Sequence, residues 1–125
     1  DDFTASELCC ACGGGTGCAV SYFVNNGTAR GPQFVAMTGS SNPFDGLEGL
    51  EVGMYSTPLF ADVDNDGDVD LVLGDTSGTL KYFENNGNST APVFIARVGG
   101  ANPFASVDVH GRSAPALVDY DKDAI

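Results

Sequence analysis

Basic side chains are scarce in this chain. Its 125 residues include five Lys and Arg against 17 Asp and Glu, so the formal net charge is −12 at pH 7. A surface this acidic repels phosphates, and we therefore expect no nucleic-acid partner and no anionic membrane surface as partner. No apolar run reaches the length of a membrane span, and no secretory leader is recognisable, so we expect any targeting segment to have been removed or to lie outside this sequence.

Residues that mark catalysis are also few. The single histidine, His110, stands beside Gly111, and no nearby motif marks a nucleophile or an orienting acid. The glycine-rich run at residues 13–17 lacks the Lys of a phosphate-binding loop and follows cysteines instead of a strand, which favours a linker. Paired carboxylates for glycoside hydrolysis stay an alternative, but the clustered acids are better assigned to a metal. We predict that the protein is not an enzyme.

Cysteine is confined to the first eighteen residues, at Cys9, Cys10, Cys12 and Cys18. The even count predicts disulfides formed in an oxidising compartment, and the glycosylation sequons at Asn26 and Asn88 agree with a secreted, extracellular protein. A zinc site is the alternative, but it lacks a second Cys-x-x-Cys pair. Because adjacent cysteines rarely bond to each other, a disulfide to another chain stays open.

Five aspartates stand within nine residues, at Asp62, Asp64, Asp66, Asp68 and Asp70. Carboxylates this close raise each other's pKa values, whereas a hard divalent cation turns their repulsion into coordination. The first three occupy positions 1, 3 and 5 of a loop that Gly67 allows to bend, and the Asp68 carbonyl would follow as a ligand. Position 12 is Leu73 and not the Glu of an EF-hand. The pattern predicts a Ca²⁺ site of another type, with a solvated acidic turn as the alternative.

The loop is flanked by short apolar runs that predict strands. Residues 58–61 precede it, and residues 69–73 follow it as a β-branched run closed by Gly74. Residues 78–83 form a further extended run before an Asn-Asn-Gly turn. The predicted order is strand, metal loop, strand, turn, strand.

The chain repeats itself with a period of about 60 residues. Residues 22–44 align without a gap to residues 82–104, with 12 identical positions, and residues 56–66 match residues 113–123. Both copies carry an Asn-Gly hairpin signal, and repeat-related pairs of Phe predict shared core positions. The second metal loop is partial, because Ala124 replaces the glycine. Its candidate ligands are Asp119, Asp121 and Asp123.

The run SxPxFxDVDxDGDxDLVxGxxxGTLxYFENNG, followed by APVF and GxxNPF, resembles the FG-GAP/VCBS repeat of extracellular proteins. The resemblance implies four-stranded β-propeller blades with a calcium loop between the first two strands. It further implies ligation by Asp62, Asp64, Asp66, the Asp68 carbonyl and Asp70. We predict an all-β chain: a cysteine- and glycine-rich segment at residues 1–18, which resembles the tail of small modules in secreted microbial proteins, then about two tandem blade-like antiparallel repeats at residues 19–125.

Two repeats are too few for a closed propeller, which needs at least about four blades. We therefore expect an incomplete propeller or open repeat array, either within a longer protein or completed by copies of itself through open strand edges. The favoured function is a secreted, calcium-stabilised structural or adhesive module that self-assembles into an extracellular filament or matrix. The alternative is a glycan- or protein-binding propeller fragment. Tyrosines would then stack on sugars, although Tyr22 and Tyr82 are interpreted as packing residues because the repeat relates them.

Overall fold

The computed structural model describes residues 20–45, residue 47 and residues 56–119. The chain divides into two compact units, Asp1–Glu51 and Val52–Ile125. The cysteine-rich segment predicted at residues 1–18, with all four cysteines, lies outside the described residues. Within the described part of the chain, no helix is long and apolar enough to cross a membrane.

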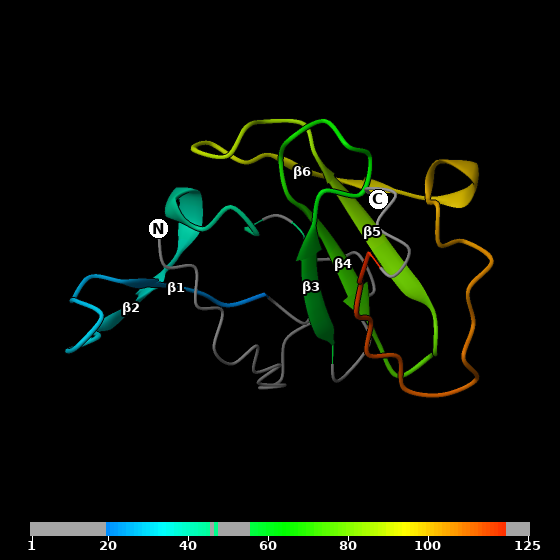
Figure 1. The fold of residues 1–125 in the computed structure, drawn as a ribbon, viewed down its shortest axis with the longest axis horizontal. Helices are drawn as coiled ribbons and strands as arrows, with labels where there is room; N and C mark the ends of the chain where they lie inside the picture. The colour runs from blue at the N-terminus through cyan, green and yellow to red at the C-terminus, as the bar shows by residue number, and fades with distance from the viewer. Residues whose placement is uncertain (1–19, 46, 48–55, 120–125) are drawn as a thin grey trace. The chain divides into compact units, whose positions relative to one another are not determined.

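The second unit contains a four-stranded antiparallel sheet (Figure 1). Its strands lie side by side in chain order, and a short 3₁₀ helix, η2 (Gly99–Ala101), follows the last one. Each strand is joined to the next by a loop or tight turn, which is the usual connectivity of an antiparallel meander. The prediction of a four-stranded, blade-like repeat is confirmed. The strands are β3 (Thr57–Ala61), β4 (Asp70–Gly74), β5 (Leu80–Asn85) and β6 (Phe94–Arg97).

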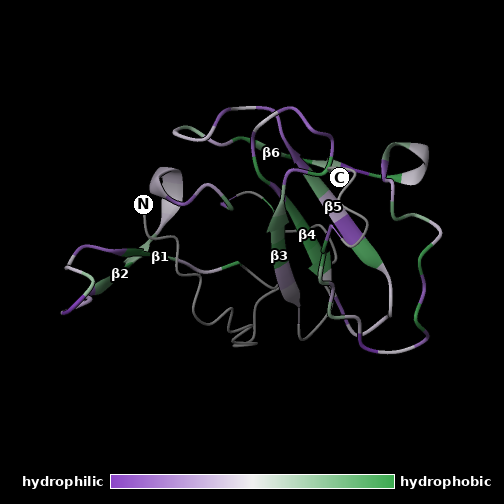
Figure 2. Ribbon diagram, in the orientation of Figure 1, coloured by the Kyte–Doolittle hydropathy of each residue, from purple (hydrophilic) through white to green (hydrophobic). Residues whose placement is uncertain are grey.

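Strand β4 forms the centre of this sheet. All five of its residues are buried, and Leu71, Val72 and Leu73 have no exposed surface. Successive side chains of a strand point to opposite faces, so an uninterrupted apolar run means burial on both faces. Figure 2 shows this contrast between the apolar β4 and the polar loop that precedes it. Because both faces of β4 are apolar, its own pattern does not select a strand register. The register depends on the residues of β3 and β5 that pair with it.

The first unit repeats part of this architecture. Strands β1 (Tyr22–Asn25) and β2 (Phe34–Met37) pair antiparallel, and the 3₁₀ helix η1 (Gly39–Ser41) follows. Tyr22 pairs with Met37 in the same register in which Tyr82 pairs with Arg97. The strands β1 and β2 are thus the structural equivalents of β5 and β6, at an offset of 60 residues.

Each hairpin is closed by the side chain of the asparagine that ends its first strand. The Oδ1 atom of Asn85 accepts hydrogen bonds from the N–H groups of Gly87 (3.0 Å) and Val93 (2.9 Å). The equivalent atom of Asn25 accepts from Gly27 and Gln33, both at 2.9 Å. An asparagine that bonds to the backbone two residues on stabilises a turn, and here the same oxygen also fixes the returning strand.

The repeated Asn-Pro-Phe triplets hold the segment after each hairpin. The side-chain N–H of Asn102 donates to the Leu80 carbonyl (3.0 Å), and its Oδ1 accepts from the Phe104 N–H (2.9 Å). The ring of Phe104 then meets Tyr82 edge to face at 6.1 Å. Asn42 makes the same pair of bonds in the first unit. The triplet is therefore a turn whose aromatic residue packs on the first strand of the hairpin.

The predicted aromatic core holds only in part. Phe44 and Phe83 are buried and Phe94 and Phe104 are half-buried, but Phe23 and Phe34 are 38% and 45% exposed. The difference follows from strand pairing, because β5 lies between β4 and β6 whereas β1, in the described residues, pairs with β2 alone. Strand β4 therefore covers Phe83. No strand equivalent to β4 lies beside Phe23, the repeat equivalent of Phe83, in the described residues.

The segment that repeats β3 is not a strand. Residues 113–119 have no regular structure, since they lack, within the described residues, the antiparallel partner that β4 supplies to β3. Buried Ser113 is nevertheless fixed to the turn between β4 and β5. Its N–H donates to the Asp75 carbonyl (2.9 Å), and its hydroxyl donates to the Thr79 carbonyl (2.9 Å). The Asp75 N–H donates to the Ser113 hydroxyl in return (2.8 Å). Sequence analysis did not foresee this contact.

The hairpin turn after β5 has no room for a side chain at Gly87. A Cβ atom there would lie 2.2 Å from the Ala91 carbonyl oxygen and 2.7 Å from the Val93 nitrogen. We expect Gly87→Ala to lower the free energy of unfolding by about 1–3 kcal/mol, the usual cost of overpacking. Gly100→Ala, where a Cβ meets nothing within 4 Å, is the control. Urea denaturation measures both, and equal stability of the two variants would contradict this account of the turn.

Candidate metal centre

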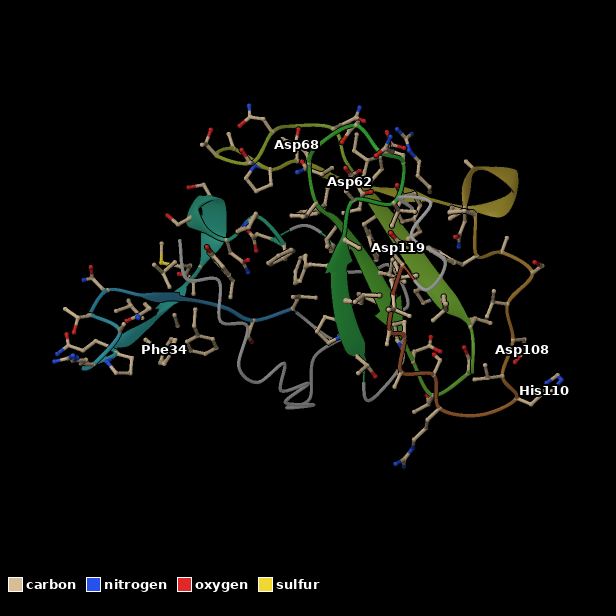
Figure 3. The ribbon with its side chains drawn as sticks, in the orientation of Figure 1. Phe34, Asp62, Asp68, Asp108, His110 and Asp119 are labelled. Atoms are coloured by element: carbon tan, nitrogen blue, oxygen red, sulfur yellow. The ribbon has the colours of Figure 1, made fainter. Side chains whose placement is uncertain are left out.

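The acidic loop joins β3 to β4, and Figure 3 shows Asp62 and Asp68 on it. Backbone N–H groups fold the loop around Asp62, whose Oδ1 accepts from Asp66 (3.1 Å) and whose Oδ2 accepts from Gly67 (3.0 Å). Asn65 and Gly67 have positive φ angles of 63° and 99°, a conformation that Asn tolerates and Gly adopts freely. The strand–loop–strand arrangement confirms that this is not a helix-flanked EF-hand.

Three carboxylates of the loop converge. Asp62 is half-buried, Asp64 is exposed and Asp70 is buried, and one carboxylate oxygen of each lies within 4.8 Å of the others. The pairing of Ala61 with Asp70 explains the convergence, because it brings the end of β3 to the start of β4. The group could hold a metal ion, and oxygen-only ligands suit a hard cation.

Asp70 connects this cluster to the core of the sheet. Its Oδ1 accepts from the Asn85 N–H (2.8 Å), and its Oδ2 accepts from the Val63 N–H (2.9 Å) and the Tyr82 hydroxyl (3.0 Å). Burial and the hydrogen bond to Asp70 raise the pKa of Tyr82, so the phenol stays protonated and donates. The carboxylate at the start of β4 is thus held in place by two donors on β5 and by one in the loop itself.

The carboxyl group of Asp64 has a raised pKa. Desolvation, followed by the negative charges of Asp66 and Asp70, raises the pKa of its carboxyl group above the usual value. The unfolded chain therefore loses this proton at a lower pH than the folded protein does. Between these two pKa values the free energy of unfolding falls as pH rises, because repulsion opposes ionisation in the folded state. A bound cation would remove the repulsion.

A bidentate ion pair lies on the neighbouring strands. Arg97 donates through Nε to Glu84 Oε2 (2.8 Å) and through Nη2 to Glu84 Oε1 (2.7 Å). This pairing lowers the pKa of Glu84 and raises the pKa of Arg97. Glu84 also adds to the negative field at Asp64, although its own charge is balanced by Arg97. The ion pair therefore limits the excess of negative charge beside the loop.

The converging group of carboxylates does not include those of Asp66 and Asp68. Asp66 is exposed, and its Oδ1 accepts from the Asp68 N–H at 2.9 Å, which directs that oxygen into the loop. Asp68 is half-buried. In the second copy Asp119, which Figure 3 labels, is exposed, while Asp121 and Asp123 lie outside the described residues. Asp62, Asp64 and Asp70 are thus the ligand set that the geometry brings together.

Sequence reasoning missed Tyr82 as a support of the cluster, although the repeat correctly marked it and Tyr22 as packing residues. Tyr22 is half-buried with its ring edge to face against Phe44 at 5.8 Å, and Tyr82 is buried. The only signal for the Tyr82–Asp70 bond is the β4–β5 register, in which Tyr82 pairs with Val72, two residues from Asp70. Tyr55 and Tyr120 lie outside the described residues.

These features define a β-repeat protein with a metal-competent acidic loop between the first two strands of a four-stranded unit. A model of the FG-GAP-like repeat family matches residues 62–125, and the chain belongs to this family. The family consists of β-propeller-like modules, which are typical of extracellular proteins. No curated protein and no solved structure matches the chain.

The support of Asp70 by Tyr82 can be measured directly. Tyr82→Phe removes one donor from a buried carboxylate, and we expect a loss of about 1.5–3 kcal/mol in the free energy of unfolding, as for hydrogen bonds to charged groups. Asp70→Asn provides the background for a double-mutant cycle. Tyr82→Phe should cost clearly less in that background, since the charge-assisted bond is already gone. Strictly additive effects, measured by chemical denaturation without metal, would show that the two side chains are not coupled.

Proposed function

We propose that this chain is a secreted module whose acidic loop binds Ca²⁺ and whose β repeat has a structural or adhesive role. The observation that carries the proposal is the convergence of Asp62, Asp64 and Asp70 at the junction of β3 and β4. Calcium accepts six to eight oxygen ligands in flexible geometry, which backbone carbonyls and water complete readily. Asp66 and the Asp68 carbonyl are within the same short loop and are proposed as further ligands on the metal-bound form.

The metal's role in this proposal is structural. Asp70 is at once a candidate ligand and the acceptor of hydrogen bonds from Tyr82 and Asn85, so an ion on the loop is tied to the sheet. We further propose that the protein has no enzymatic activity. His110 is largely exposed and pairs with Asp108 at 3.5 Å, on the loop after η2 that Figure 3 shows far from the labelled loop acids.

Self-association is supported by the strand edges. Strands β3 and β6 each pair on one side only in the described residues, and an edge strand offers unpaired backbone groups to another chain. Apolar side chains are exposed on β2, at Phe34 and Val35. We propose that copies of the chain use such edges to build an extracellular assembly. The packing of Tyr22 and Tyr82 against neighbouring side chains favours this role over stacking on glycans.

Calcium should stabilise the folded protein. We expect Ca²⁺ to raise the melting temperature and EDTA to reverse the rise, with about 2.7 kcal/mol gained when free calcium is 100 times the dissociation constant. Asp64→Asn should remove much of this gain. It should also raise the melting temperature of the metal-free protein at neutral pH, because it relieves the repulsion from Asp66 and Asp70. Differential scanning calorimetry at matched ionic strength measures both effects.

Asp45→Asn is the matched control, since it makes the same change of charge at an exposed position in the first unit. Its calcium response should equal that of the unsubstituted protein. A melting temperature that Ca²⁺ and EDTA leave unchanged, or an equal loss of response in both variants, would reject the assigned site.

Assembly should depend on the metal if the loop orders the edge strand β3. We expect light scattering and electron microscopy to show larger particles or filaments in Ca²⁺ and smaller species in EDTA. A protein that stays monomeric in Ca²⁺ at all accessible concentrations would contradict self-assembly and favour a binding module, without affecting the metal site.

A further inference from the structure

The two glycosylation sequons of this chain fall on the same structural element. Asn26-Gly27-Thr28 lies on the turn between β1 and β2, and Asn88-Ser89-Thr90 lies on the turn between β5 and β6. Both asparagines are exposed. The turns are structural equivalents, each closed by a two-residue bridge, Thr28 with Gly31 and Asn88 with Ala91.

The sequons are not copies of each other. In the repeat alignment Asn26 corresponds to Asn86, which is followed two positions later by Asn88 and not by Ser or Thr. Asn88 in turn corresponds to Thr28. Duplication of the repeat therefore explains the shared turn but not the shared motif, since the acceptor asparagine sits two residues later in the second unit.

The hydrogen bonds at Asn88 leave its amide nitrogen available. Its Oδ1 accepts from the Thr90 N–H (3.0 Å), the Thr90 hydroxyl (2.8 Å) and the Ala91 N–H (2.9 Å). The turn thus uses only the oxygen, whereas N-glycosylation substitutes only Nδ2. Asn42 and Asn102 show the opposite use, because their Nδ2 atoms donate to backbone carbonyls. Asn26 contributes to its own turn through its backbone N–H, which donates to the Gln33 carbonyl at 2.7 Å.

We propose that Asn26 and Asn88 are both N-glycosylated, so that each repeat carries a glycan on its hairpin turn. The donor is an oligosaccharide joined through its anomeric carbon to a lipid pyrophosphate. The asparagine Nδ2 forms a bond to that carbon, the carbon–oxygen bond to the phosphate breaks, the lipid pyrophosphate leaves and Nδ2 loses one proton. The modification rests on the secretion proposed above, because the sequon is read in the secretory pathway.

The position of Asn88 also constrains the assembly. In an antiparallel meander the β3–β4 loop and the β5–β6 turn lie at the same end of the sheet, as Figure 1 shows. A glycan at Asn88 therefore keeps the metal-loop end of the second unit hydrated and hinders protein contact there. In the proposed assembly, other copies contact the edges of β3 and β6, which have no second partner strand among the described residues.

The test is secretion of the full chain from a eukaryotic host, followed by peptide mapping after treatment with peptide N-glycosidase. Enzymatic release converts an occupied asparagine to aspartate, so we expect Asp at positions 26 and 88. Thr90→Ala should abolish the modification of Asn88, and Thr90→Ser, which keeps both the sequon and a hydroxyl, should retain it. Thr28→Ala and Thr28→Ser form the matched pair for Asn26. If either threonine had only a structural role, its substitution by alanine would leave the mass of the attached glycan unchanged.

Unmodified asparagine at either position in the folded, secreted protein would overturn the assignment of that position. The same preparation is melted with and without Ca²⁺. If the protein is secreted without a glycan but responds to Ca²⁺, the modification is rejected and the proposed metal site stands. If the protein is secreted with glycans but does not respond to Ca²⁺, the metal site is rejected and the modification stands.

Discussion

The buried carboxylate of Asp70 is the constraint on which the second unit depends. A charged group with no exposed surface is tolerated only when its oxygens are satisfied, and here Val63, Tyr82 and Asn85 supply three donors. These donors come from the acidic loop and from β5, while Asp70 itself starts β4. One side chain thus links β4 to β5, holds the loop and lies beside the other acids, so a metal ion bound on the loop would be coupled to the sheet.

A second set of polar contacts makes the repeat reproducible. The side chains of Asn85 and Asn102, like those of Asn25 and Asn42, satisfy backbone groups that turns would otherwise leave unpaired. Each unit therefore forms its hairpin and the following turn by the same local bonds, whatever its apolar neighbours. Burial differs between the units because it depends on the number of paired strands, as the contrast between Phe23 and Phe83 shows.

These two kinds of contact, those of Asp70 and those of the asparagine side chains, suit a modular protein. Local asparagine contacts define each turn, the β4 strand and Asp70 define the complete sheet, and Ser113 joins the segment that begins the next repeat to Asp75 of the preceding one. Membership of the FG-GAP-like repeat family fits this construction. In the proposed function, Ca²⁺ removes the repulsion between the loop carboxylates and glycans are attached to the hairpin turns. The edges of β3 and β6 make the contacts between copies.

The repeat, the hairpin turns, the strand–loop–strand order and the acidic loop could be predicted from the amino-acid sequence, because each depends on residues close together in the chain. Which acids converge could not, because their positions depend on strand pairing. Asp62 and Asp70 meet because β3 pairs with β4, and Tyr82 reaches Asp70 because β4 pairs with β5. Burial was equally beyond the sequence, since the same phenylalanine of the repeat is covered or exposed according to the strands beside it.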